Sequence, residues 1–424
     1  MKSALAVLAI GAVGAGCSSS GGAAQAPTRP VQVQAALPSE PVTDYLAYVG
    51  GKSGRADPGL APVTLGFLAQ QGGAIEPGPG AEAGASLAAQ YINEQLGGIG
   101  GHPLELSTCF IRSAEEEGTR CAQQFLGNSN VKAVVTGAVA TGIQSFYATL
   151  AGKLPVVVGV ALTNVDRAQD NAAILYGDAQ AVLAPFGTYA AQVLHARRAA
   201  VVFQESPDLT AGAASLAASL TAVGVTVKKV GYAPTSTDLV GPLSAAGAAT
   251  ADMVVPFSNP AGCVNIANSL EQVGIDPKKV VTNPSCLVPE VAAALDGDFP
   301  QWTYSIASAV PADTTDPATA PYKDVFKQFG AADLAGNPWA EVAFGEVMTT
   351  ARAMNALGVD AMDPASLQSQ IRSFRGPLIM GTPELACGKQ AAAPGLCGDA
   401  SQFFRYEGKG RFVNASGGFL RPPQ

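Results

Sequence analysis

The chain has 424 residues, enough for two or three domains, and its 48% hydrophobic and 14% charged residues exclude disorder over most of its length. Its net charge is −8 and no basic cluster is longer than the pair Arg197 and Arg198, so we expect no nucleic-acid partner. Only two histidines occur, His102 and His195, which argues against histidine metal sites and Ser-His-Asp catalysis. We therefore expect no catalytic residue, no metal and no cofactor.

The first residues predict export. A short positive start and an apolar run over 4–15, too short to span a bilayer, are typical of a signal peptide over 1–16. The run ends at Cys17 in a sequence that resembles a bacterial lipobox, with Gly14 where Leu is usual. The resemblance implies a lipid on Cys17 that anchors the protein to the outer face of the cytoplasmic membrane, with 17–60 as anchor and tether. Ordinary signal cleavage, with Cys17 incidental, is the alternative.

From residue 63 the chain alternates strands and helices, which predicts an α/β fold with parallel sheets and right-handed crossovers. The rhythm restarts near residue 182, which indicates two lobes, and a terminal stretch over 402–413 reads as strand that completes an earlier sheet. We expect strands at 63–68, 104–108, 131–135, 154–159, 199–203, 226–231, 252–257 and 279–282, and helices at 81–96, 114–126, 143–151, 182–195, 211–223, 264–273 and 339–357.

Apart from Cys17 the chain has six cysteines, an even number in an exported protein, which favours disulfides. The simplest of the possible pairings joins near neighbours, and the alternative of a metal site lacks Cys-x-x-Cys spacing. The expected pairs are Cys109 with Cys121, Cys263 with Cys286 and Cys387 with Cys397.

The order of features over about 63–420 resembles the periplasmic binding proteins of the leucine/isoleucine/valine-binding type. The stretches that carry the resemblance are Leu65-Gly-Phe-Leu68, Ala89-Gln-Tyr-Ile-Asn-Glu94, Gly97-Gly-Ile-Gly-Gly101, Leu154-Pro155, Gly274-Ile275 and Gly376-Pro-Leu378. The resemblance implies a type I fold with three hinge crossovers, in which 63–180 plus 304–357 form one lobe and 181–303 plus 358–424 the other. It also implies a monomer that captures a small solute between closing lobes and delivers it to the permease of an ABC importer.

Two loops match family positions that hold the ligand, at the carboxyl ends of strands where solutes bind in α/β sheets. Thr141 with Gly142 matches the first, and the alternative is that Thr141 merely caps a helix. Ala161 and Thr163 match the second, with a simple polar turn as the alternative. Trp339 matches an aromatic residue that lines the cleft, or else it packs in the core.

The second lobe departs from the family pattern. Ser285 stands where amino-acid binders place a Glu that pairs with the ligand's ammonium, and Leu209 replaces an aromatic, although Phe257 is retained. A buried ammonium without a counter-charge is costly, so the pattern suits an uncharged, branched or aromatic ligand with one carboxylate or amide. Glu290 or Asp208 could substitute for the absent Glu.

Two other functions stay open. A ligand-sensing receptor that reports to a membrane signalling partner would have the same fold, whereas an exported hydrolase would need a base that the chain barely possesses. The acidic run Glu115 to Glu117 is predicted to be a solvated helix start, favoured by the helix dipole, and not a catalytic pair.

Overall fold

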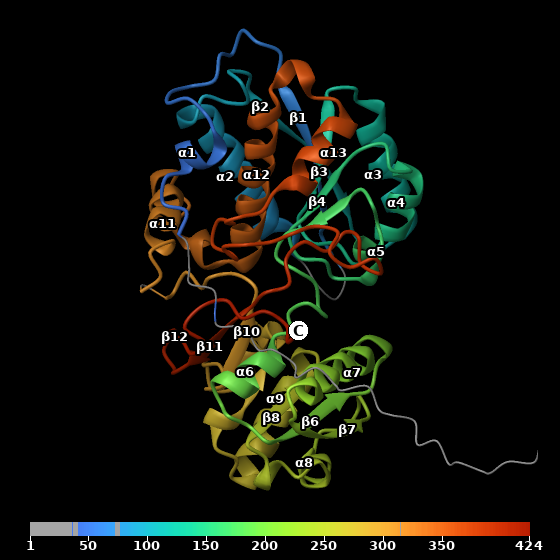
Figure 1. The fold of residues 1–424 in the computed structure, drawn as a ribbon, viewed down its shortest axis with the longest axis vertical. Coiled ribbons are helices and arrows are strands. Elements are labelled where there is room, and N and C mark those ends of the chain that lie inside the picture. The colour runs from blue at the N-terminus through green and yellow to red at the C-terminus, as the bar shows by residue number, and fades with distance from the viewer. Residues whose placement is uncertain (1–35, 37–40, 73–76, 314) are drawn as a thin grey trace, which may run out of the picture. The chain divides into compact units, whose positions relative to one another are not determined.

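The described chain folds into two α/β lobes, each built on a sheet (Figure 1). The computed structural model describes residue 36 and residues 41–72, 77–313 and 315–424. The predicted signal peptide and the predicted lipidation site, Cys17, lie outside the described residues. Alternating strands and parallel pairing confirm the expected fold class.

The first lobe has a parallel five-stranded sheet in the order β2-β1-β3-β4-β5. Strands β1, β3 and β4 are almost wholly buried, as parallel strands covered on both faces should be, whereas the edge strand β2 is only partly buried. Their bounds are β1 (Val63–Gln70), β2 (Leu104–Ile111), β3 (Val131–Thr136), β4 (Val156–Val158) and β5 (Ala172–Ile174). The helices of this lobe are α1 (Tyr45–Val49), α2 (Gly78–Gln95), α3 (Glu116–Gly127), α4 (Ile143–Leu150), α5 (Asn164–Arg167), α11 (Thr319–Gln328), α12 (Pro338–Leu357) and α13 (Pro364–Ser373), with 3₁₀ turns at η4 (Ala332–Gly336) and η5 (Val359–Ala361).

Each face of this sheet has its own core. Val135 and Val157 point into the core that α1, α2 and α12 cover, whereas their neighbours Val134 and Val156 join the core that α3 and α4 cover. Helices α2 and α12 approach closely because Gly84 has no side chain, since a Cβ there would lie 2.6 Å from the Cα of Ala340.

The second lobe combines two short sheets that an isolated parallel bridge between Val254 and Val280 joins. One has the order β7-β6-β8, and the other β12-β11-β10-β9, in which β10 pairs with β11 and β11 with β12 in antiparallel register. The strands are β6 (Arg198–Gln204), β7 (Thr226–Tyr232), β8 (Met253–Phe257), β9 (Val281–Thr282), β10 (Thr303–Ile306), β11 (Gln402–Tyr406) and β12 (Phe412–Asn414). The helices are α6 (Phe186–Gln192), α7 (Pro207–Ala222), α8 (Val240–Ala246), α9 (Pro260–Val273) and α10 (Pro289–Ala294), with η1 (Ala248–Thr250), η2 (Pro277–Lys279) and η3 (Pro284–Cys286). The terminal strands thus complete a sheet begun earlier, as predicted.

The chain passes between the lobes three times, and one boundary differs from the expected one. It leaves the first lobe after β5, returns after β10 and leaves again before β11. Residues 358–398, which the sequence analysis assigned to the second lobe, pack on the first. Leu367 of α13 and Ile379 lie in its core, and Leu396 pairs with Ile174 of β5. The short turn after α12 keeps α13 beside that helix, so its apolar face is buried there.

Three disulfides have the predicted pairing of neighbouring cysteines. Cys109–Cys121 ties β2 to α3, and Cys263–Cys286 ties α9 to the turn after β9. Cys387–Cys397 closes a loop in the segment without regular structure that packs on the first lobe. Each bond therefore closes a local unit of the fold.

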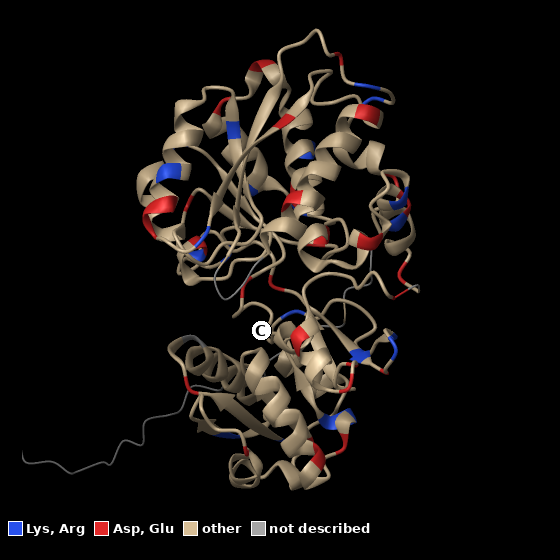
Figure 2. Ribbon diagram, turned by 180° about the vertical axis from the view of Figure 1, so that it is seen from behind, with Lys and Arg blue, Asp and Glu red and all other residues tan. Residues whose placement is uncertain are grey.

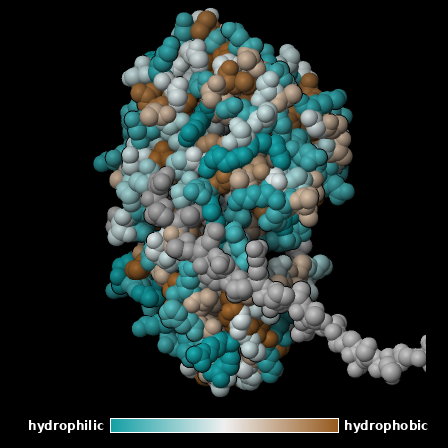
Figure 3. Space-filling view, viewed as in Figure 1, coloured by the Kyte–Doolittle hydropathy of each residue, from teal (hydrophilic) through white to brown (hydrophobic). Residues whose placement is uncertain are grey.

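The surface of the described chain is polar and mixed in charge. Acidic and basic residues are scattered over the helices and loops, and hydrophobic residues on the visible face alternate with hydrophilic ones (Figures 2 and 3). Within the described ranges only Leu60, at 39%, is a markedly exposed large hydrophobic residue. None of the helices there is long and apolar enough to cross a bilayer.

Candidate ligand-binding site

The predicted site loops of the first lobe follow β3 and β4, at the carboxyl edge of the sheet. Strand β1 lies beside β3, so its last residue, Gln70, ends at the same edge. The carboxyl edge of a parallel sheet is where open α/β folds bind ligands. The structure therefore brings Gln70, the loop at 137–142 and the loop at 159–163 to one edge.

The loop after β3 presents one free hydroxyl. Thr141 is half-buried, and within the described chain its hydroxyl has no hydrogen-bond partner. Thr141 does not cap the following helix, because Gly142 is the N-cap of α4, with a left-handed φ of 74° that suits glycine. The capping alternative for Thr141 is therefore wrong, and the hydroxyl is available for another partner.

Side chains from elsewhere in the first lobe bind the backbone of this loop. The Oε1 atom of Gln70 accepts hydrogen bonds from the N–H groups of Ala140 at 2.9 Å and Thr141 at 3.1 Å. The carboxylate of Glu115 accepts from the N–H groups of Gly142 at 2.8 Å and Ser145 at 2.9 Å. These contacts were not predicted from the sequence, because they join residues at least 27 positions apart along the chain.

The acidic run that contains Glu115 is more specific than the predicted solvated helix start. Glu117 accepts hydrogen bonds from the N–H groups of Arg112, Ser113 and Ala114, and these bonds hold the pKa of its carboxyl below its usual range. Glu115 instead caps α4, which is a neighbouring helix. The two carboxylates therefore stabilise two different helix starts.

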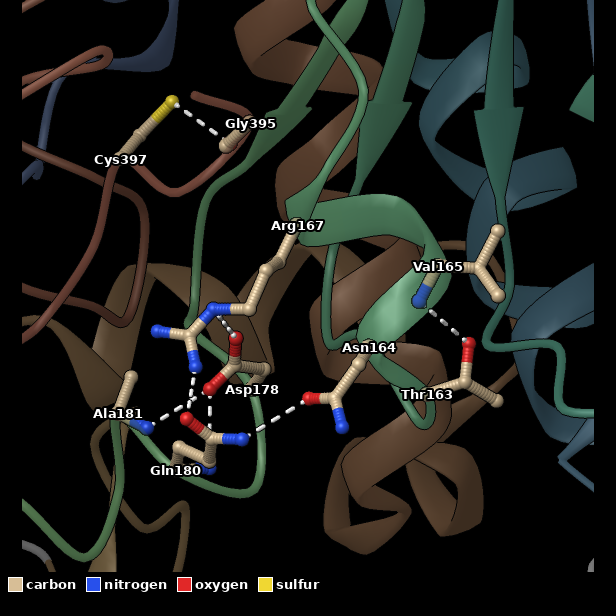
Figure 4. Close-up of polar contacts among 9 residues, drawn as sticks. All are labelled: Thr163, Asn164, Val165, Arg167, Asp178, Gln180, Ala181, Gly395 and Cys397. Atoms are coloured by element: carbon tan, nitrogen blue, oxygen red, sulfur yellow. Dashed lines mark hydrogen bonds and ion pairs between the residues drawn. The ribbon is translucent and has the colours of Figure 1, made fainter. Parts of the chain in front are cut away.

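The loop after β4 combines a buried backbone with a capping hydroxyl. Ala161 is buried, and its N–H donates to the carbonyl of Gly177 at 3.1 Å. The Thr163 hydroxyl accepts from the N–H of Val165 at 3.2 Å and so caps the short α5 (Figure 4). The polar-turn alternative thus describes what Thr163 does in this structure, while its hydroxyl proton can still be donated.

An ion-pair network that the sequence analysis missed holds this loop to the first crossing between the lobes (Figure 4). Arg167 Nε lies 3.1 Å from Asp178 Oδ2, and these side chains are only 14% and 3% exposed. Asp178 also accepts from the N–H groups of Gln180 and Ala181, and Gln180 donates to Asn164 at 3.0 Å. Arg167 also donates to Gln180, and these contacts together with the shielded ion pair hold both segments in place. The two segments lie on either side of β5, and no local pattern in the sequence indicates that they pair.

Helix α5 carries one buried carboxyl, that of Asp166. Burial raises the pKa of Asp166 to about 7, although the hydroxyl of Tyr147 donates a hydrogen bond to it at 2.9 Å. This residue links α5 to α4 under the candidate site.

Trp339 lies at the start of α12 and is half-buried against the first-lobe core. Asn337 caps this helix by accepting from the N–H groups of Trp339 at 2.9 Å and Ala340 at 3.2 Å. Contact with the first-lobe core thus buries part of the surface of the Trp339 indole.

In the second lobe the predicted residues serve the core more than a site. Phe257 is only 3% exposed, and it packs on α7, where a Cβ on Gly212 would lie 2.5 Å from its Cε1. Leu209 is half-buried against the same core. The Ser285 hydroxyl lies 2.9 Å from the carbonyl of Ser258 and 2.7 Å from Asn283 Oδ1.

The two carboxylates considered as substitutes for the absent Glu lie on helices of the second lobe. Glu290 is exposed in the first turn of α10, and Asp208 is the second residue of α7. The side chain of Glu290 takes part in no hydrogen bond or ion pair of the described chain.

Two acidic residues on α12 are buried without full pairing. Both carboxyl oxygens of Glu346 and the Oε1 atom of Glu341 lack hydrogen-bond partners in the described chain. Burial holds the pKa of each carboxyl well above its usual range, and Asp316 adds to the rise at Glu341 while Ser308 opposes it. Glu346 lies beside Gly159 at the end of β4, where an added Cβ would lie 2.8 Å from its Cδ.

The structure thus has two α/β lobes, between which the chain passes three times, and threonine-bearing loops at the carboxyl ends of β3 and β4. The family model described as periplasmic binding protein matches residues 62–394, and the chain belongs to this family. No curated protein sequence matches it. Nothing in the described ranges gathers three or more metal-ligating side chains that could hold an ion.

Solved structures of low sequence identity share the fold. A leucine-binding protein of Thermotoga maritima MSB8 has 17% identity and a TM-score of 0.64 over 85% of this chain and 99% of that one. A solute-binding protein of an ABC transporter of R. palustris, in complex with 4-hydroxybenzoate, has 13% identity and a TM-score of 0.65 over 86% and 98%. A fatty acid ABC transporter substrate-binding protein of Thermomonospora curvata has 13% identity and a TM-score of 0.64 over 88% and 95%.

Proposed function

We propose that this protein is the extracytoplasmic solute-binding component of an ABC importer and that it has no catalytic activity of its own. The observation that carries the proposal is the meeting of two loops, each with one threonine, at the carboxyl edge of the first-lobe sheet, in a chain of the periplasmic binding protein family. The leucine, 4-hydroxybenzoate and fatty acid named for its structural relatives make small organic solutes the ligand class to test.

In this proposal the first lobe supplies the polar contacts. The Thr141 hydroxyl, which has no hydrogen-bond partner among the described residues, binds the ligand, and Gly142 lets the ligand approach the backbone. The carbonyl of Ala161 and the hydroxyl of Thr163 provide further polar contacts, and Trp339 supplies an apolar wall. In the second lobe Leu209, Phe257 and Ser285 line the opposite side of the ligand.

The protein is further proposed to reach the membrane through a lipid on Cys17, to act as a monomer, and to pass its ligand to permease subunits. The Thr141 hydroxyl and the half-buried Trp339 indole contribute to affinity by making a hydrogen bond and an apolar contact with the bound ligand. The expected outcome is capture by lobe closure, as in hinge-type binding proteins.

A thermal-shift screen tests the binding function. The purified protein is heated with amino acids, amides, urea derivatives, and aliphatic and aromatic carboxylates, and a ligand of the folded state at about a hundredfold excess over Kd stabilises it by about 2.7 kcal/mol. Thr141→Val should weaken the binding of the ligand found while leaving the ligand-free Tm unchanged, and Thr226→Val, an exposed position on β7, is the matched control. Absence of any shift across the panel would refute the proposal.

Uptake in cells distinguishes an importer from a sensor. Deletion of the gene should abolish accumulation of the labelled ligand, and expression of the intact protein should restore it. Unchanged uptake with a lost transcriptional response to the ligand would instead support the receptor alternative.

A further inference from the structure

Glu115 occupies the backbone donors that a carboxylate would use at the candidate site. Its two oxygens accept from Gly142 N at 2.8 Å and Ser145 N at 2.9 Å, at the start of the eight-residue α4. Gln70 Oε1 takes the two preceding donors, those of Ala140 and Thr141. Four backbone N–H groups around Thr141 are therefore bound by side chains of the same chain.

The position of Glu115 is built into the fold. The Ser145 hydroxyl donates to the carbonyl of Glu115, so backbone and side chain of this residue both contact α4. The starts of α3 and α4 touch, because a Cβ on Gly118 would lie 2.8 Å from the carbonyl carbon of Gly142. The carboxylate thus reaches α4 from a backbone already held against it, which keeps the entropy cost of the contact low.

We infer that Glu115 is a specificity-determining residue that excludes carboxylates from this site and makes the protein select ligands whose polar end is uncharged, such as amides. The inference rests on the proposed function. An incoming carboxylate would meet the negative charge of Glu115 and would find the N–H groups of Ala140, Thr141, Gly142 and Ser145 already hydrogen-bonded. The Thr141 hydroxyl can both donate and accept, so it suits the N–H and C=O groups of an amide.

The alternative location for an anion within this loop is closed as well. Gln70 is buried, and its Nε2 group donates to the carbonyl of Gly72 at 2.8 Å, which fixes its Oε1 toward the loop. A carboxamide oxygen in this orientation repels an anion and leaves no donor for it.

The first test removes the Glu115 carboxylate and asks whether acetate binds in its place. Glu115→Ala should lower Tm, and acetate should raise it again in a saturable manner, whereas acetamide and chloride at matched ionic strength should not. The wild-type protein and Glu116→Ala, which removes an exposed neighbouring charge with no partner in the described fold, should show no saturable response to acetate. A saturable response of the wild type, or none in Glu115→Ala, would overturn the inference.

The second test compares acids with their amides by calorimetry on the full chain. The probes are 4-hydroxybenzoate with 4-hydroxybenzamide and isovalerate with isovaleramide, whose members differ in charge and little in shape. We expect the wild type to bind the amide of a pair at least about tenfold more tightly, and Glu115→Gln to narrow that ratio by about tenfold or more while Glu116→Gln leaves it unchanged. Equal affinity of the wild type for acid and amide would overturn the inference.

The two tests separate the inference from the proposed function. If neither pair binds, the acetate test still decides whether Glu115 fills an anion site, and the broad ligand screen decides whether the protein binds a solute. If Glu115→Ala does not fold, Glu115→Gln in the acetate test decides the matter, because it removes the charge and keeps one acceptor oxygen.

Discussion

Replacing Glu346 by Gln should make the protein more stable at neutral and alkaline pH. The carboxyl is fully buried on α12, has no hydrogen-bond partner in the described chain and lies against Gly159, so its charged form is strongly disfavoured. Burial raises its pKa well above the ordinary 4.5, so the folded protein keeps it protonated at pH values where the unfolded chain has released the proton. Gln has nearly the same shape and never ionises.

The sign and size of the effect follow from proton linkage. The unfolded chain binds fewer protons than the folded protein above pH 4.5, so the free energy of unfolding falls as pH rises toward the folded pKa. The slope for one such group is about 1.4 kcal/mol per pH unit. Above pH 5.5 the variant should therefore gain stability on the wild type with each rise in pH until the pH reaches the folded pKa. Below the unfolded pKa the gain should vanish.

Denaturation by guanidinium at several pH values measures this gain. Glu341 and Asp166 have raised pKa values for the same reason, so the variant should keep part of the wild-type pH dependence and lose only the share of one group. Glu271→Gln, an exposed change on α9, is the control and should leave the pH slope unchanged. Parallel pH profiles of wild type and Glu346→Gln would refute the reasoning, because they would mean that the carboxyl is ionised or hydrated in the folded state.

Three further substitutions test the packing of the fold. Cys263→Ser with Cys286→Ser opens a loop with a sequence separation of 23 and should lower the free energy of unfolding by about 3 kcal/mol, and an unchanged denaturation midpoint would contradict this. Asn337→Ala removes two cap hydrogen bonds from α12 and should cost about 1 kcal/mol, with a smaller loss for Asn337→Ser, which can still cap. Gly159→Ala forces a methyl group against the Glu346 side chain and should cost about 1–3 kcal/mol by thermal denaturation, and a neutral effect would mean that α12 can shift.

The parts of the fold that the sequence predicted are those with a local cause. Alternating apolar strands and amphipathic helices depend on neighbouring residues, so the two lobes and their strand order along the chain follow from pattern alone. The disulfide pairs are local too, since each joins cysteines close in sequence. The place of 358–398 was not predictable in this way, because Ile379 and Leu396 have no regular element to reveal their partners, and distant strands determine where they pack.

The candidate site, too, was predicted only in those features that have a local cause in the sequence. The loops after β3 and β4 were predicted, since the positions of strand ends follow from the strands themselves. The side chains that hydrogen-bond to these loops were not predicted, because they come from other βα units. Gln70 lies 70 residues before Ala140, and Asp178, which follows β5, pairs with Arg167 of the preceding α5.

The sheet order explains why an acidic residue after β2 reaches a helix after β3. Strand β1 lies between these two strands, so the turn that contains Glu115, the end of β1 at Gln70 and the loop at Thr141 converge on one edge. A helix start attracts negative charge whether the carboxylate belongs to its own chain segment, to a neighbour or to a ligand. A prediction from local sequence could assign the acidic run only to the helix that follows it, α3. In the structure Glu117 accepts hydrogen bonds from N–H groups just before α3, whereas Glu115 accepts them from N–H groups at the start of α4. The contact of Glu115 with α4 places a negative charge of the protein where a carboxylate ligand would have to bind.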